Sequence, residues 1–173
     1  LTVTRTASTT PLFTYGYPST VFISDIPTLK VTSVGGVNVP ENPSGSYGSP
    51  DITLPATTTN PVSITVSATN VPVGTQITVT SVPEYGSAST GTATLSGTDS
   101  SSSATAQVNL STQYQCILTA QATFTLQTAM FYEGEKVEKV RVATSMGKGQ
   151  EVVYITESGK EVSAQQMLAS VMK

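Results

Sequence analysis

Hydrophobic and polar residues alternate one by one along much of this chain, which is typical of β-strands with one buried and one solvated face. In Val62–Thr69, apolar residues take every second position and Ser or Thr takes the positions between them. Residues 75–82 repeat the pattern after the turn-forming segment 70–74. Because an antiparallel sandwich strand buries one face and exposes the other, these segments predict two strands joined by a tight turn.

The longest alternating stretch covers residues 114–128. Its even-numbered positions from Tyr114 to Leu126 are aromatic, apolar or small, whereas the odd-numbered positions are Gln and Thr apart from one Ile. We expect the even-numbered side chains to face the core, with Leu118 and Phe124 buried on the same sheet face. Cys116 falls in this inward-facing set, so we interpret it as a small core residue and not as a reactive thiol.

Shorter segments complete the predicted set of strands. The same alternation predicts strands at residues 1–6, 20–24, 28–34, 91–97 and 103–110. Residues 35–50 and 55–61 contain too much Pro and Gly for strand interiors and are expected to be long connections. Short strands separated by regularly spaced turns predict an all-β, Greek-key β-sandwich.

The stretch from Asp51 to Leu126 resembles the immunoglobulin-like domains of bacterial exported and surface proteins. Two features carry the resemblance: the unit strand–Asn70-Val-Pro-Val-Gly-Thr75–strand, and the final long strand that ends Ala-Thr-Phe-Thr-Leu126. It covers under half of the chain, and the core Trp and cysteine pair of antibody domains are absent. The resemblance implies an immunoglobulin-like core at about residues 51–128, within a Ser/Thr-rich sandwich of residues 1–129.

Charge separates a C-terminal part from this sandwich. Residues 130–173 hold 12 of the 19 charged side chains. In this part, alternating residues 136–144 and 150–156 flank Met146-Gly-Lys-Gly149, which predicts a β-hairpin. Ser163 and Gln166 have the spacing of a helix capping box, followed by apolar residues at helical spacing. Residues 130–173 are therefore predicted to form a charged hairpin and a short terminal helix, separable from the sandwich.

The composition leaves few routes to catalysis or metal binding. The chain has no His, which removes Ser-His-Asp arrangements and His metal sites, and its single Cys excludes disulfides and multi-thiolate sites. A pair of carboxylates could hydrolyse glycosides, and the candidates Asp25, Glu41, Asp51 and Glu84 all lie in predicted loops, where nothing in the sequence brings two of them together. No run of carboxylates has the spacing of a calcium site, so Asp99 is interpreted as a turn residue. We expect no enzymatic activity, no cofactor and no metal.

Three further positions have two readings each. Lys30, within a predicted strand, is either a solvated edge lysine or, if it points inward, a partner in an isopeptide crosslink to Asn. Asn109-Leu-Ser111 matches a glycosylation acceptor, and Thr57–Thr59 offers sites for O-linked sugar, although such short matches occur often by chance.

Surface chemistry narrows the class of partner. Charged residues make up 11% of the chain, the net charge is −3, and 52 of the 173 residues are Ser or Thr. Without a basic stripe there is nothing to attract nucleic acid or anionic lipid. No apolar run is long enough for a membrane span. The chain starts at Leu1 without an initiator Met, so we expect a processed product or a fragment.

Two functions from different classes fit these observations. The first is a non-catalytic structural subunit outside the bacterial cytoplasm, at the cell surface or in the extracellular space. It would belong to a filament, pilus-like fibre, surface layer or adhesin and contact copies of itself or other surface proteins. Leu1 and Val3 would then belong to an assembly strand exchanged between subunits. The alternative is a carbohydrate-binding module that uses the aromatic cluster Phe13, Tyr15 and Tyr17, which would otherwise plug the end of the sandwich or form an interface.

Overall fold

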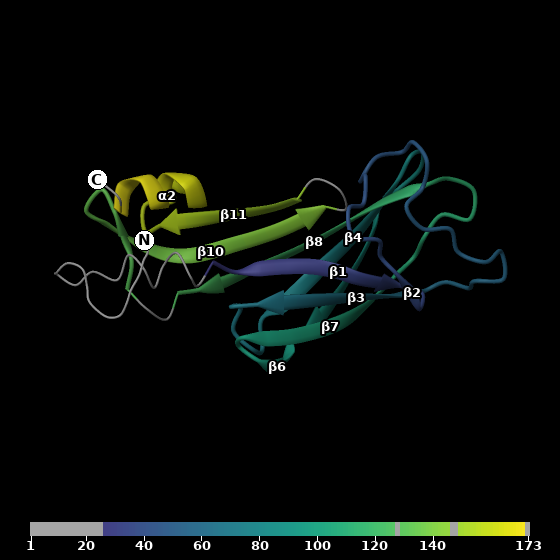
Figure 1. Ribbon diagram of the computed structural model, residues 1–173, viewed down its shortest axis with the longest axis horizontal. Coiled ribbons are helices and arrows are strands. Elements are labelled where there is room, and N and C mark those ends of the chain that lie inside the picture. The colour runs from purple at the N-terminus through teal and green to yellow at the C-terminus, as the bar shows by residue number, and fades with distance from the viewer. Residues whose placement is uncertain (1–25, 127–128, 146–148, 172–173) are drawn as a thin grey trace. The chain divides into compact units, whose positions relative to one another are not determined.

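The computed structural model describes residues 26–126, 129–145 and 149–171, which form two antiparallel β-sheets and a helix (Figure 1). The first sheet has the order β2-β1-β3-β7-β6. Its strands are β1 (Thr28–Val34), β2 (Val37–Asn38), β3 (Val62–Thr69), β6 (Ser96–Thr98) and β7 (Ser101–Val108). The predicted strands at 1–6 and 20–24 lie outside the described residues, as do Leu1, Val3, Phe13, Tyr15 and Tyr17.

The second sheet has the order β12-β11-β10-β8-β4-β5, and β9 pairs with β10. Its strands are β4 (Gln76–Pro83), β5 (Ser89–Thr94), β8 (Cys116–Thr125), β9 (Phe131–Tyr132), β10 (Glu135–Ser145), β11 (Gly149–Thr156) and β12 (Glu161–Ser163). The helix is α2 (Ala164–Val171). The expected β-sandwich with a C-terminal hairpin and a short terminal helix is confirmed.

Spatial contacts divide the chain into two compact units, and β10 and β11 contribute to both. We call Thr28–Phe124 with Arg141–Glu151 the sandwich unit. The tail unit contains Thr125–Val140 and the chain from Val152 onward. The predicted boundary between residues 129 and 130 remains a prediction.

The core of the sandwich unit follows from the alternation in the sequence. In β3 the buried positions are Val62, Ile64, Val66 and Ala68. β3 pairs in register with β7, so that Ile64 lies opposite the buried Ala106. β7 in turn packs against β4 and β5 of the other sheet. Branched residues opposite alanines thus pack into the space between the two sheets.

Hydroxyl groups cover the outer faces of these strands and bond to one another across the sheets. Thr65 and Thr105 are joined by a hydrogen bond of 3.3 Å between β3 and β7, and Thr80 and Thr90 by one of the same length between β4 and β5. Such cross-strand pairs stabilise a sheet without charge. In these strands, the Ser and Thr residues therefore form the outer faces of folded sheets.

The predicted strand at residues 91–97 is in fact divided between the two sheets. Its first part belongs to β5 in the second sheet and its last part to β6 in the first sheet. The buried Leu95 marks the crossing, with its N–H donating to the carbonyl of Thr75 and its own carbonyl accepting from Gly74. Asp99 secures the following turn by accepting a hydrogen bond from the Val73 N–H at 2.8 Å. Alternation alone does not reveal this crossing, because both halves keep the same pattern.

The ends of the long alternating stretch are less buried than expected. Leu118 is buried as predicted, but Phe124 is only half-buried and Tyr114 is 43% exposed. The register explains the difference at both ends. The last residue of β8 that pairs with β4 is Ala122, so Phe124 lies beyond the end of β4, and Tyr114 precedes the start of β8. The prediction that Phe124 is fully buried was wrong, because its side chain is only half-buried.

The start of the helix in the tail unit is as predicted. The Gln166 N–H donates to Ser163 Oγ at 3.1 Å, and the Ser163 N–H donates to Gln166 Oε1 at 2.9 Å. The buried Met167 then anchors the apolar face of α2. Residues 161–163, for which the sequence predicted no strand, form β12, in which Val162 is buried opposite Tyr154.

Ser163→Ala should lower the free energy of unfolding by about 1 kcal/mol, because it removes the hydroxyl acceptor at the start of the helix. Urea denaturation followed by circular dichroism measures the change. Ser170→Ala, near the other end of α2, is the matched control and should be neutral or slightly stabilising because alanine has the higher helix propensity. Equal losses in the two variants would show that the capping bonds contribute nothing.

Candidate functional site

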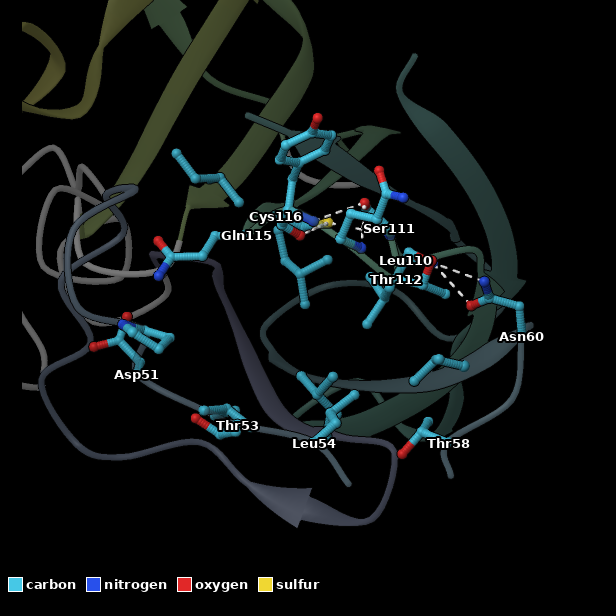
Figure 2. Close-up of a pocket in the computed structure, with 18 of the residues that line it drawn as sticks. Asp51, Thr53, Leu54, Thr58, Asn60, Leu110, Ser111, Thr112, Gln115 and Cys116 are labelled. Carbon is cyan, nitrogen blue, oxygen red and sulfur yellow. Dashed lines mark hydrogen bonds between the residues drawn. The ribbon is translucent and has the colours of Figure 1, made fainter. Parts of the chain in front are cut away.

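A pocket of about 430 Å³ opens in the sandwich unit between two connecting segments, residues 50–60 and residues 110–115 (Figure 2). In Figure 2, Asp51, Thr53 and Leu54 lie on one side of the pocket, and Ser111, Thr112 and Cys116 on the other. Strand residues contribute to the lining as well, among them Val34, Val62 and Leu118. The pocket therefore lies where connecting segments meet the ends of strands, a common place for binding sites on rigid scaffolds.

Side-chain hydrogen bonds hold the first of these segments in place. The Asp51 carboxylate accepts from the Ser44 N–H at 2.9 Å and from the Ser44 hydroxyl at 3.2 Å. Tyr47 donates its hydroxyl to the carbonyl of Val82 at 2.8 Å. Asn60 ties this segment to the other one, since its side chain donates to the Leu110 carbonyl and accepts from the Leu110 N–H, both at 2.9 Å. This side of the pocket is therefore held by side-chain hydrogen bonds and not by backbone pairing between strands.

The second segment is held by a local turn. Ser111 Oγ accepts from the N–H groups of Gln113 and Tyr114 at 3.1 and 3.0 Å. The Cys116 thiol closes the same turn, accepting from the Ser111 N–H and donating to the Tyr114 carbonyl. Cys116 is half-buried and lines the pocket, so the expectation of a simple core residue needs correction. β8 begins at Cys116, where the opposite sheet no longer covers its inward face completely.

One polar atom of the lining has no partner. Gln115 Oε1 is buried without a hydrogen bond, although the backbone carbonyl of the same residue accepts from the Glu84 N–H at 2.9 Å. Figure 2 shows the Gln115 side chain on the side of the pocket toward Asp51. An unpaired buried acceptor is unfavourable by about 1–3 kcal/mol, so a ligand that donates a hydrogen bond to this atom would remove this penalty.

An exposed aromatic pair adjoins the pocket. Tyr85 is 64% exposed and Tyr114 is 43% exposed, and their ring centroids lie 5.1 Å apart at an interplanar angle of 66°. Tyr114 itself lines the pocket. The two rings meet because Tyr85 follows β4 and Tyr114 precedes β8, and these strands pair at Pro83 and Cys116. Sequence reasoning missed this pair, although the flanking position of each Tyr on two antiparallel strands was the signal that could have found it.

The carboxylates considered as catalytic or calcium ligands do not come together. Asp51 is engaged by its own segment, Asp99 serves a turn, Glu41 and Glu84 are exposed, and Asp25 lies outside the described residues. Among residues 26–126, 129–145 and 149–171, no group of three or more His, Cys, Asp or Glu side chains is arranged for a metal ion. In the same part of the chain, no helix is long and apolar enough to cross a membrane.

Lys30 lies on the solvated face of β1, opposite Ser67 of β3. The reading as a solvated lysine is therefore confirmed. A crosslink to Asn would need an inward-pointing amine, and the side chain at this position does not face the core.

Charged residues gather at a turn of the tail unit. Lys160 Nζ lies 2.8 Å from Glu133 Oε1 and 5.3 Å from the ring centroid of Tyr132. Hydrogen bonds from Ser158 lower the pKa of Glu135. The hydrogen bond between Lys160 and Glu133 raises the pKa of Lys160. These charges are solvated, so the cluster holds the turn between β11 and β12 and offers no buried acid or base.

The chain matches no protein-family model, and comparisons with curated proteins and with solved structures found no similar protein.

Proposed function

We propose that this chain is a non-catalytic structural subunit of an assembly outside the bacterial cytoplasm, such as a filament, pilus-like fibre, surface layer or adhesin. It acts through contacts between protein surfaces. The proposal includes an immunoglobulin-like Greek-key topology for the sandwich unit. In support, β1-β3-β7-β6 and β10-β8-β4-β5 follow the strand orders A-B-E-D and G-F-C-C′ of that fold.

The observation that carries the proposed function is the edge strand β5. At the other ends of the two sheets, β2 has two residues and β6 and β12 have three each. β5 has six residues, pairs with β4 along its whole length, and contains neither a charged residue nor proline. Short edges, charges and prolines are the devices by which proteins prevent edge-to-edge pairing. β5 uses none of them, so it offers a pairing edge to another chain.

The strand we assign to this edge is residues 1–6 of a neighbouring subunit. This segment has the same length as β5, and Leu1 and Val3 alternate with Thr. An added strand would gain backbone hydrogen bonds from β5, while Thr90, Thr92 and Thr94 on its exposed face would pair with hydroxyls of the incoming strand. Because donor and acceptor are different surfaces of the chain, the contact is heterologous and propagates into an open polymer.

Two changes should abolish polymers while leaving the subunit folded: Thr92→Lys, which places a charge on the β5 edge, and deletion of residues 1–10, which removes the donor strand. Light scattering and electron microscopy of the purified chain measure assembly, and circular dichroism measures folding. Thr105→Lys adds the same charge to the exposed face of β7, away from the β5 edge, and should still polymerise.

The results of these experiments distinguish a failure of the proposed function from a wrong assignment of the pairing strands. An intact chain that stays monomeric at every concentration would overturn the proposed function. Polymers that survive both Thr92→Lys and the deletion would leave the function standing, but they would show that assembly uses neither β5 nor residues 1–6.

A further inference from the structure

We propose that the pocket of the sandwich unit binds a neutral oligosaccharide, with the Tyr85–Tyr114 pair as the platform for a sugar ring and Gln115 Oε1 as a hydrogen-bond acceptor. This site differs from the aromatic cluster considered in the sequence, and it does not depend on the proposed assembly. It gives the subunit a second capacity, the recognition of glycan.

The aromatic pair supplies the apolar half of the recognition. Tyrosine combines a large apolar ring with a polar tip, and it is enriched at interfaces where one end of the side chain is apolar and the other is wet. Tyr85 and Tyr114 meet edge to face, so a ring face stays uncovered by the partner ring. The C–H face of a pyranose ring is an apolar, flat surface that fits such a ring. The pocket volume of about 430 Å³ falls within the range of roughly 300–1,000 Å³ of small-molecule sites.

Uncharged polar groups supply the other half. Gln115 Oε1 lacks a donor and is covered in the unliganded chain, so the side chain must rotate slightly before a sugar hydroxyl can donate to this atom. Thr53, Thr112 and Gln113 also line the pocket and are exposed, so their hydroxyl and amide groups remain accessible to further sugar hydroxyls. In most small-molecule sites, a small number of precisely placed polar groups in a mainly apolar cavity fix the orientation of the ligand.

The charge of the lining selects a neutral ligand. No Lys or Arg lines the pocket, so a phosphate, sulfate or carboxylate group would meet no cation. The one acidic side chain of the lining, Asp51, is bonded to Ser44 and would repel an anionic sugar. Sugars without ionised groups are therefore preferred.

The backbone of the walls disfavours an extended peptide. Peptides that dock along an edge need unpaired N–H and carbonyl groups. Here the N–H groups of Ser111, Gln113 and Tyr114 are bonded within the turn, and both backbone groups of Leu110 are bonded to Asn60. The accessible chemistry is therefore that of side-chain rings, hydroxyls and amides.

The test begins with an array of neutral gluco-, xylo-, manno- and N-acetylglucosamine oligosaccharides, together with acidic oligosaccharides and extended peptides as competing classes. The tightest neutral binder is then titrated by calorimetry against the intact chain and its variants. Tyr114→Ala and Tyr85→Ala should each weaken binding by about tenfold, since each removes a stacking surface. Phe131→Ala is the matched control, because Phe131 is 60% exposed and does not line the pocket.

Gln115→Met gives a sharper readout, because the side chain keeps its length and loses the unpaired acceptor. Its affinity for the sugar should fall by about tenfold, while its stability in urea stays the same or rises. A purely structural role for Gln115 would lower stability instead. The inference is overturned if no neutral sugar binds, if acidic sugars or peptides bind in preference, or if all variants keep wild-type affinity.

Discussion

Gly91→Ala should lower the free energy of unfolding by about 3 kcal/mol. A Cβ atom at this position would lie 2.1 Å from the Gln107 carbonyl oxygen and 3.3 Å from a methyl group of Val108. The nearest atom belongs to the backbone of β7, so relief requires that β5 and β7 move apart and that the core between them loosens. Urea denaturation of the intact chain, followed by circular dichroism, measures the loss.

Gly48→Ala is the matched control for this substitution. Its Cβ atom would meet only Ser46 Oγ at 3.6 Å, which is ordinary contact, so its stability should stay within about 0.5 kcal/mol of the wild type. If Gly91→Ala is as stable as Gly48→Ala, β5 and β7 do not approach as closely as described. The small residues of β5 would then not be explained by close packing against β7.

Ile64→Ala should cost about 2–5 kcal/mol, and it should cost more than Phe124→Ala although Phe is the larger residue. Ile64 is completely buried in β3, with paired strands on both sides, so its truncation leaves a cavity that the neighbours cannot fill. Phe124 is half-buried beyond the end of β4 and loses less contact.

Parallel urea denaturation of the two variants decides the order of these effects. A larger loss for Phe124→Ala would restore the expectation from the sequence that this residue is a main core residue. Such a result would also mean that the hydrophobic core extends further toward the C-terminal end of β8 than the exposed fractions of its side chains indicate.

The aromatic pair illustrates why the candidate site was not predictable as a whole. Each residue of the site is ordinary in its local sequence: Tyr85 follows a strand, Tyr114 precedes one, and Gln115 takes a position that alternation assigns to the solvated face. Only the antiparallel pairing of β4 with β8 brings the rings together. Periodicity reports which face a residue takes within its strand, but it carries no information on which strand ends meet.

By itself, the sequence determined what depends on neighbours along the chain. The alternation in Val62–Thr69 placed β3 and its buried face, and the Ser163–Gln166 spacing placed the start of α2, because these features rest on contacts between residues a few positions apart. The tertiary structure alone decided the crossing at Leu95 between the sheets, the close approach at Gly91, the partial exposure of Phe124 and the pocket beside Tyr114. Each of these depends on strand order, register and strand length, which are set by packing between segments distant in sequence, and a local pattern cannot encode them.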